Sequence, residues 1–160
     1  MSIKLTQLFS GGAIVPRLAA TSRDEAITEL VDALVTAGAA RANLRDELVK
    51  RVLARERQGS TGFGKGVAVP HVKHDSVTTM RAAIGLSPKG IDFAALDRQP
   101  VYSIFLLLSP AEKPEEHLQA MEAIFGNLSK DTFRRFLRQA ATEDEVRTLL
   151  EEADNRRFTA

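Results

Sequence analysis

The chain has 160 residues, of which 44% are hydrophobic and 27% charged, and its formal net charge is +1. We expect one domain over residues 1–160 with the composition of an ordinary soluble globular protein. The near balance of charge argues against bulk binding of nucleic acid. The absence of cysteine excludes disulfides, thiolate catalysis and cysteine metal sites.

Long apolar runs are absent from the sequence. The longest strongly apolar run, Ile104–Leu108, is far shorter than a membrane span, and Gly11–Pro16 is too short for the core of a signal peptide. We therefore expect a cytoplasmic protein without membrane insertion. Two local basic clusters are candidate partner sites, although a solvated helix face is the simpler interpretation of the second: Arg51, Arg55 and Arg57, and Arg134, Arg135 and Arg138.

The N-terminal third predicts two helices. Residues 3–20 give mixed signals, and we assign them no element. A capping box at 22–25 precedes apolar residues at helical spacing, and Gly38 provides a stop. Asn43 can cap a second helix, whose apolar stripe ends in the polar run 55–58.

A glycine-rich segment follows the second predicted helix. Four glycines at 59–66 predict a flexible loop that leads into a short β-branched strand, Val67–Val69. Pro70 is expected to end that strand, because proline lacks a backbone donor and has a fixed φ. The polar residues 72–78 then indicate a loop.

Two further strands are expected in the middle of the chain. The first covers 80–86 and ends in a turn at 87–90, and the residues up to 97 are ambiguous. The second, 101–108, is apolar except at Ser103 and is bounded by prolines, which favours a central strand buried on both faces.

The C-terminal third predicts three helices. Pro114 favours a helix start, Asp131 can cap a short helix, and a second capping box at 142–145 opens the last one. Helices, then strands, then helices again predict an α/β fold with a mixed central β-sheet flanked by helices.

The segment Gly59–Lys65 almost matches the nucleotide P-loop. Gly66 stands where the motif needs a magnesium-binding hydroxyl, and the element order is helix, loop, strand instead of strand, loop, helix. We therefore reject ATP or GTP binding by this motif. A dinucleotide fingerprint fails too, because Val67 occupies the third glycine position.

Histidine is the scarcest residue able to carry chemistry, with only three copies. His71 follows a strand end beside the glycine segment, where it is well placed to meet an anion, although a structural histidine is an equally good interpretation. His117 lies in the first turn of a helix, where free amides draw anions, but it shares a face with core residues. A zinc site of His71, His74 and His117 is disfavoured, because no strong fourth ligand is indicated.

Several motifs together resemble one protein family. Arg55-Glu56, Gly59-Ser60-Thr61-Gly62, Gly64 and Val67-Ala68-Val69-Pro70-His71 resemble the fructose/mannitol-type IIA components of the bacterial phosphoenolpyruvate:sugar phosphotransferase system. The resemblance covers nearly the whole chain, including the spacing to His117, and looks closest to the nitrogen-regulatory IIA branch. It implies the sandwich fold of that family, and a phosphocarrier rather than a turnover enzyme.

The resemblance also implies roles for single residues. His71 is the implied phosphoryl acceptor and donor, which takes the group from a phosphorylated histidine-containing carrier protein, and His117 and Arg55 match further active-site residues. No metal or other cofactor is implied. We expect the phosphate loop and the partner-docking face at Gly62, Phe63, Gly64 and Gly66.

The sequence departs from the family pattern after His71. Val72 stands where the family commonly has glycine, so the following loop is expected to take a different path, because a β-branched residue disfavours positive φ. His74 matches no family catalytic position and is interpreted as a surface loop residue. Three functions stay open: a regulatory IIA that binds a target protein, a IIA that donates to a sugar-specific IIB, and an interaction module that has lost phosphoryl transfer.

Overall fold

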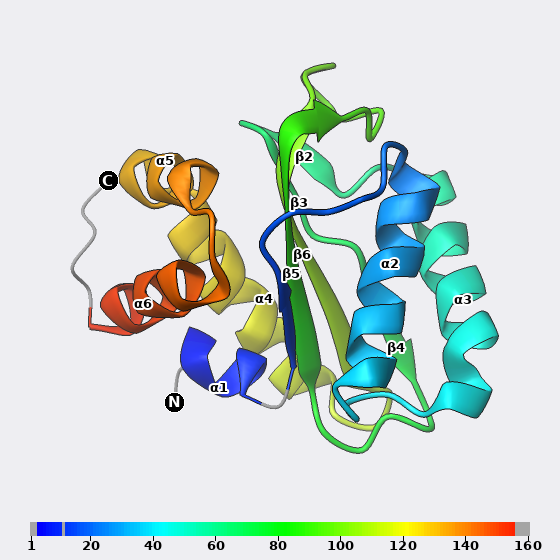
Figure 1. Ribbon diagram of the computed structural model, residues 1–160. Coiled ribbons are helices and arrows are strands. Elements are labelled where there is room, and N and C mark those ends of the chain that lie inside the picture. Colours follow the sequence, from blue (N-terminus) through cyan, green and yellow to red (C-terminus); the bar gives the residue numbers. More distant parts are fainter. Residues whose placement is uncertain (1–2, 11, 156–160) are drawn as a thin grey trace.

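The computed structural model describes residues 3–10 and 12–155. In this part of the chain a six-stranded mixed sheet lies between two helical layers (Figure 1). The strands are β1 (Ala13–Val15), β2 (Gly62–Gly64), β3 (Val67–Ala68), β4 (His71–His74), β5 (Arg81–Ile91) and β6 (Val101–Pro110). The helices are α1 (Leu5–Phe9), α2 (Arg23–Thr36), α3 (Arg45–Gln58), α4 (Pro114–Leu128), α5 (Asp131–Gln139) and α6 (Glu143–Asp154), with a 3₁₀ turn at Ala42–Leu44.

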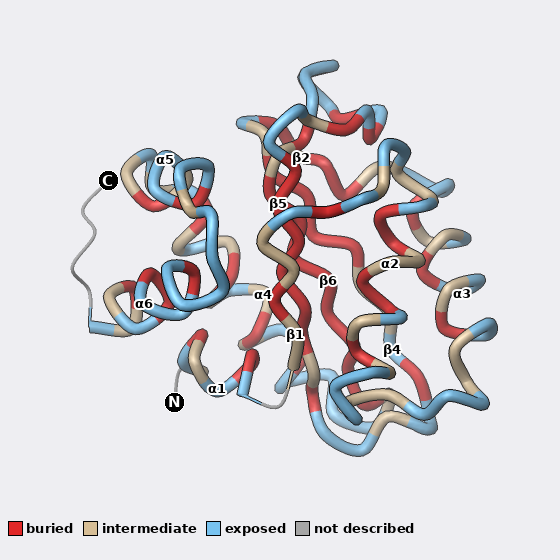
Figure 2. The backbone as a smooth tube through the Cα atoms, viewed as in Figure 1, coloured by how far each residue is buried: buried red, intermediate tan, exposed pale blue. Residues whose placement is uncertain are grey.

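Strand β6 is the centre of the sheet. The order is β1-β5-β6-β3-β2, and β4 also pairs with β6. Strands β5 and β6 are antiparallel, whereas β1 is parallel to β5, and β3 and β4 are parallel to β6. Nine of the ten residues of β6 are buried (Figure 2), which confirms the predicted central strand and the mixed-sheet fold class.

Each face of the sheet has its own apolar core. Helices α2 and α3 cover one face, with Ile27, Leu30 and Leu34 fully buried, while α1, α4, α5 and α6 cover the other (Figure 1). No helix among residues 3–10 and 12–155 is long and apolar enough to span a membrane.

Local capping signals placed two helix starts correctly. The hydroxyls of Ser22 and Thr142 accept the backbone amides of Glu25 and Glu145, so the N-caps of both predicted capping boxes are confirmed. The caps predicted at Asn43 and Asp131 are wrong, because the N-caps of α3 and α5 are Leu44 and Lys130. Pro114 is the first residue of α4, as expected. These signals involve residues three apart, which a single sequence displays directly.

Strand β3 ends at Ala68, before Pro70, so the predicted end of this strand is confirmed, but the loop predicted from residue 72 is wrong. Val67 pairs with Ser103 and His71 with Leu107, so β3 and β4 keep the same offset to β6 on either side of the proline. The carbonyl of Pro70 still accepts the amide of Leu107 at 2.9 Å. Pairing with β6 therefore resumes after the proline and runs through His74.

The glycine-rich segment is a hairpin and not the predicted flexible loop. Gly62–Gly64 forms β2, and Lys65 and Gly66 make a two-residue turn into β3. Both turn residues have positive φ, 63° and 79°, as the tight turn favoured in β-hairpins requires. The glycines therefore specify a defined turn.

The strand predicted at 80–86 is longer than expected. It runs over Arg81–Ile91, so the turn predicted at 87–90 is wrong. The register with β6 shifts between Leu86 and Ile91, and Pro88 lies inside that irregularity, where the strand does not need its missing N–H. The unassigned N-terminal residues form α1 and β1, with the backbone amide of Leu5 bonded to Asp154 at 2.7 Å.

Candidate functional site

Side-chain alternation along β3 and β4 brings two histidines together. Val67 and Val69 face the core beneath α4, and His71 continues the same face two residues later. His117 lies in the first turn of α4, and the centroids of the two imidazole rings are 5.4 Å apart with their planes inclined by 52°.

One ring nitrogen of His71 is fixed by the strand itself. Its Nδ1 lies 2.8 Å from the carbonyl oxygen of Val69, and because a carbonyl only accepts, Nδ1 must carry the proton. The lone pair then resides on Nε2, which has no hydrogen-bond partner among the described residues. This tautomer leaves Nε2 ready to act as a nucleophile.

The electrostatic surroundings keep His71 neutral. Burial lowers its pKa below the usual 6.5, against the opposing effect of the Val69 bond. The charges of Arg55 and Lys73 lower the pKa further, while Glu56 raises it. A neutral imidazole is the nucleophilic form, so these effects favour the reactive state near neutral pH.

His117 is buried and also neutral. Its pKa is lowered to about 4, first by burial and then by His71 and Lys73. Its Nδ1 lies 2.6 Å from the hydroxyl oxygen of Ser109, a buried residue near the end of β6. This contact holds the ring in place beside His71.

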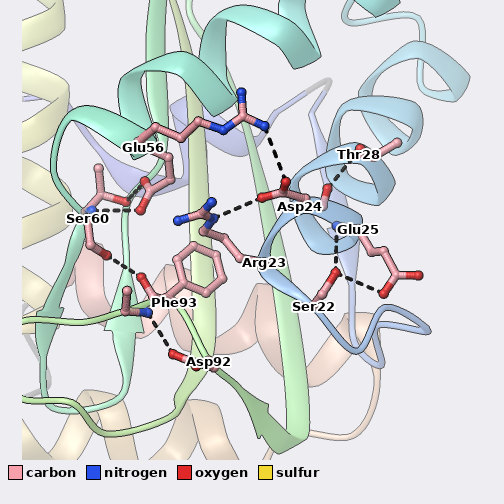
Figure 3. A network of polar contacts seen from close by, with 12 residues as sticks. Ser22, Arg23, Asp24, Glu25, Thr28, Glu56, Ser60, Asp92 and Phe93 are labelled. Carbon is pink, nitrogen blue, oxygen red and sulfur yellow. Dashed lines mark hydrogen bonds and ion pairs between the residues drawn. The ribbon is translucent and has the colours of Figure 1, made fainter.

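The C-terminal end of α3 reaches the same strand through buried contacts. Glu56 is 2% exposed, and its carboxylate accepts the backbone amide of Thr61 at 2.9 Å as well as the hydroxyl of the same residue. The carbonyl of Thr61 accepts the amide of Val69, whose own carbonyl holds His71. Figure 3 shows Glu56 reaching from α3 toward the segment that contains Ser60.

Arg55 is anchored beside this contact. Its Nη1 donates to the carbonyl of Gly59 at 2.8 Å, and its charge lowers the pKa of His71, which places the guanidinium in the electrostatic field of the site. The structure therefore brings His71 and His117 into ring contact, while Arg55 lies at the C-terminal end of α3 and acts on His71 through its charge.

Three residues of this site were given no role from the sequence. Lys73 lies two residues after His71 on the same face of β4, and alternation alone could have found it once the strand was recognised. Ser109 pairs with Lys73 across the sheet and comes from a distant segment, so no local signal points to it. Glu56 is next to Arg55 in the polar run 55–58, and a run of polar residues gives no sign that one of them is buried.

Two glycines of the hairpin, Gly64 and Gly66, lie far from His71. Gly64 sits against Asp97 and Gly66 against Tyr102, at the far end of β3 from His71. Four residues of extended chain, 67–70, separate Gly66 from His71, so the two residues are about 16 Å apart. The structure thus does not bring the amides of Gly64 and Gly66 to the histidine pair.

The other two residues of the expected docking face lie closer to α4. Gly62 is buried and pairs with Ala68, next to Val69. The ring of Phe63 contacts that of Phe125 on α4, with centroids 4.8 Å apart. A docking role for Gly62, Phe63, Gly64 and Gly66 stays a prediction.

His74 is a buried strand residue, so its interpretation as a surface loop residue is wrong. Three positions after His71, it faces α3, where its Nε2 bonds to the carboxylate of Glu47 and its Nδ1 accepts the amide of Ser76 at 3.0 Å. The pleat therefore separates His74 from His71 and His117, so the three cannot share a metal ion. No group of three or more potential metal-ligating residues occurs among residues 3–10 and 12–155.

Val72 fits its position without strain. It is extended, pairs with Leu108 and packs against the core beneath α2 and α3, and it is not among the residues with positive φ. A β-branched side chain suits such a strand. The sequence-based concern about its φ angle therefore does not apply in this fold.

The chain is similar in sequence to known proteins. The family model "Phosphoenolpyruvate-dependent sugar phosphotransferase system, EIIA 2" matches residues 7–153. The fructose-specific EIIA component of Haloferax volcanii is 36% identical over 131 residues, which cover 82% of this chain and 84% of that protein. The fructose-specific EIIABC component of Bacillus subtilis is 31% identical over 152 residues, and the chain spans only 24% of its length.

Solved structures give the same fold. The nitrogen regulatory protein IIA-Ntr from Neisseria meningitidis matches with a TM-score of 0.80 and 27% identity, over 91% of this chain and 98% of that one. The mannitol enzyme IIA of Escherichia coli, solved as a complex with phosphorylated mannitol enzyme IIB, shares the fold with a TM-score of 0.73 at 23% identity, over 86% and 93% of the two chains. The chain belongs to the EIIA 2 family of the phosphoenolpyruvate-dependent sugar phosphotransferase system.

Proposed function

We propose that the protein is a phosphocarrier that receives a phosphoryl group on Nε2 of His71 from a phosphorylated histidine-containing carrier protein. The observation that carries the proposal is the bond between Nδ1 and the carbonyl of Val69, which leaves Nε2 as the free nucleophile. Membership of the EIIA 2 family supports the choice of a phosphoryl group as cargo.

Transfer needs one bond to form and one to break. The lone pair of His71 Nε2 attacks phosphorus in line with the leaving nitrogen of the donor histidine, whose ring departs with the electron pair of the broken P–N bond. The attacking ring gains positive charge in the process. The carbonyl of Val69, fixed on the Nδ1–H, stabilises that charge without having to move.

The surrounding cations stabilise the phosphoryl oxygens. Lys73 and Arg55 place two positive charges near the ring, and both act on it electrostatically. We infer that the hydroxyl of Ser109 donates to Nδ1 of His117, so that the opposite nitrogen carries a proton for a phosphoryl oxygen. This arrangement supplies positioning and charge, the two things phosphoryl transfer demands from a protein.

Two destinations for the phosphoryl group are open. The IIA-Ntr neighbour supports a regulatory protein of the nitrogen type, in which phosphorylation changes the surface offered to a target protein. The similarity to fructose-specific EIIA components supports donation to a IIB component, the partner seen with the Escherichia coli mannitol enzyme. Either route would operate in the cytoplasm, where phosphoenolpyruvate is made.

A direct assay tests the phosphocarrier proposal. The purified chain is incubated with phosphoenolpyruvate, enzyme I and the histidine-containing carrier protein, and its intact mass is measured at neutral pH. We expect one phosphoryl group on the wild type and on His74→Gln, and none on His71→Ala. A wild-type protein that stays unmodified would favour the interaction module without transfer.

A second assay separates the two destinations. The phosphorylated protein is mixed with a fructose-type and a mannitol-type IIB, and the loss of its label is followed. Rapid transfer to either IIB supports the sugar-transport route. Retention of the label, together with target binding that differs between the two phosphorylation states, supports the regulatory route.

A further inference from the structure

A groove of about 780 Å³ opens at the end of the sheet opposite His71. It lies where the β2–β3 turn, the start of β6 and helix α5 meet. Lys65 lines it from the turn, Tyr102 from β6, and Arg135 and Arg138 from α5. Its volume is within the range of small-molecule sites in proteins.

The groove carries more positive than negative charge. Its lining contains four cationic side chains and two carboxylates. One carboxylate, Asp131, pairs with Arg134 at 3.3 Å, and the other, Asp97, accepts the backbone amides of Lys65 and Gln99 at 3.0 Å each. Both carboxylates are therefore engaged within the lining itself.

Three cations are left without a carboxylate partner. Within the described part of the chain, Lys65, Arg135 and Arg138 form no ion pair. Arg138 stacks on Tyr102, with its guanidinium carbon 3.6 Å from the ring centroid. This stacking holds the planar guanidinium in place by its face and leaves its N–H edges free to bind an anion.

The hairpin turn explains why Lys65 is in this position. Gly66 at φ 79° lies against the ring of Tyr102, where an added Cβ would come within 3.0 Å of a ring carbon. The turn can therefore pack closely on Tyr102 and present Lys65 beside the arginines of α5. The segment Gly59–Lys65, which almost matches the P-loop motif, thus contributes Lys65 to a basic groove and does not form a P-loop.

From this arrangement we infer that the groove binds a small ligand carrying two or more phosphate groups. Three unpaired cations around a hollow match several negative charges spread over neighbouring oxygens, and a guanidinium fork binds phosphate in a bidentate manner. A hollow of this size accommodates a small molecule better than it accommodates a folded acidic surface. The inference is independent of the proposed phosphocarrier function.

Titration of the full chain with defined anions tests the inference. Pyrophosphate, ATP and citrate are each added to ¹⁵N-labelled protein at low ionic strength, and amide shifts are followed by NMR. We expect pyrophosphate and ATP to shift the amides of Lys65, Gly66 and Tyr102 and those of α5, and to bind more tightly than citrate. Added salt should weaken binding, because the site is open to solvent.

Substitutions of the groove arginines test whether these residues bind the anion. Arg135→Gln and Arg138→Gln should each weaken pyrophosphate binding about tenfold, the effect of losing one hydrogen bond to a charged group. Both side chains are exposed, so the remainder of the spectrum should stay unchanged and report intact folding. Arg147→Gln on α6, outside the groove, is the matched control, and His71→Ala should bind pyrophosphate as the wild type does.

Several results would overturn the inference. Shifts centred on His71 and His117 would place the anion at the phosphoryl site. Equal or tighter binding of citrate would remove the preference for phosphate. Binding of an acidic peptide without binding of pyrophosphate would assign the groove to a protein partner, and no binding of any of these anions would leave the arginines as a solvated helix face.

Discussion

His71 and His74 lie on the same strand, three residues apart, yet their surroundings differ in kind. His71 faces α4 and uses one ring nitrogen, which bonds to a backbone carbonyl. His74 faces α3 and uses both, one with the carboxylate of Glu47 and the other with the amide of Ser76. The fold thus makes one histidine available and fully engages the other.

In the proposed mechanism, hydrogen-bond occupancy, more than burial, distinguishes the phosphoryl-accepting histidine from the structural one. A ring with both nitrogens engaged has no lone pair for an incoming phosphorus atom, whatever its charge state. The pleat of the strand decides which face each ring meets. Substitutions on either face of β4 test this contrast between the two histidines.

Removal of His117 should affect the reactive side most strongly. His117→Ala deletes the proposed donor to the phosphoryl group, beside the ring of His71, and should lower the rate constant for transfer to His71 about 100-fold. Rapid-quench kinetics with the phosphorylated carrier protein measure this, and His74→Gln is the control. A rate within threefold of the wild type would remove His117 from the mechanism.

Loss of the Glu56 carboxylate should weaken the link between α3 and the strand. Glu56→Ala leaves the amide and the hydroxyl of Thr61 without their buried acceptor, so the free energy of unfolding should fall by about 2–3 kcal/mol. Urea denaturation measures this. Thr61→Val removes only the hydroxyl contact and should cost less, and the opposite ranking would contradict the assigned contacts.

Substitution of His74 should affect stability but not transfer. His74→Gln should lower the free energy of unfolding by about 1 kcal/mol, because its partner Glu47 is itself half exposed. The rate of phosphoryl transfer should stay within twofold of wild type. A large loss of transfer in a folded His74→Gln protein would show that the two faces are coupled.

The smallest expected effect is a shift in the pH dependence of the transfer rate. The pKa of His71 lies below 6.5, so the transfer rate should be constant at higher pH and fall only as the ring becomes protonated at lower pH. Lys73→Gln removes a charge that lowers this pKa, so the fall should move to higher pH. Stopped-flow rates from pH 5 to 8 test this, and a shift to lower pH would contradict the position given to Lys73.

The parts of the fold that sequence could predict are those with local causes. The caps at Ser22 and Thr142 and the proline at the start of α4 each depend on neighbours within one helical turn. The apolar run that became β6 is likewise visible in a single segment. Element order and fold class follow from these signals.

The errors come from contacts between distant segments. Nothing near Pro70 indicates that β6 would continue to pair with the chain beyond it, so β4 and the burial of His74 were missed. For the same reason Ser109 and Lys73 received no role, and the glycine hairpin was placed beside His71. The pairing of His71 with His117 came from the family resemblance and not from spacing.

The ring nitrogen that carries phosphorus distinguishes the proposed mechanism from its alternatives. The protein is labelled with ¹⁵N-histidine and phosphorylated through the carrier protein, and long-range ¹H–¹⁵N correlation spectra identify the nitrogen that carries phosphorus. The contact between Nδ1 and the carbonyl of Val69 predicts phosphorus on Nε2 of His71. Phosphorus on Nδ1 of His71, or on either nitrogen of His74, would contradict the proposed mechanism.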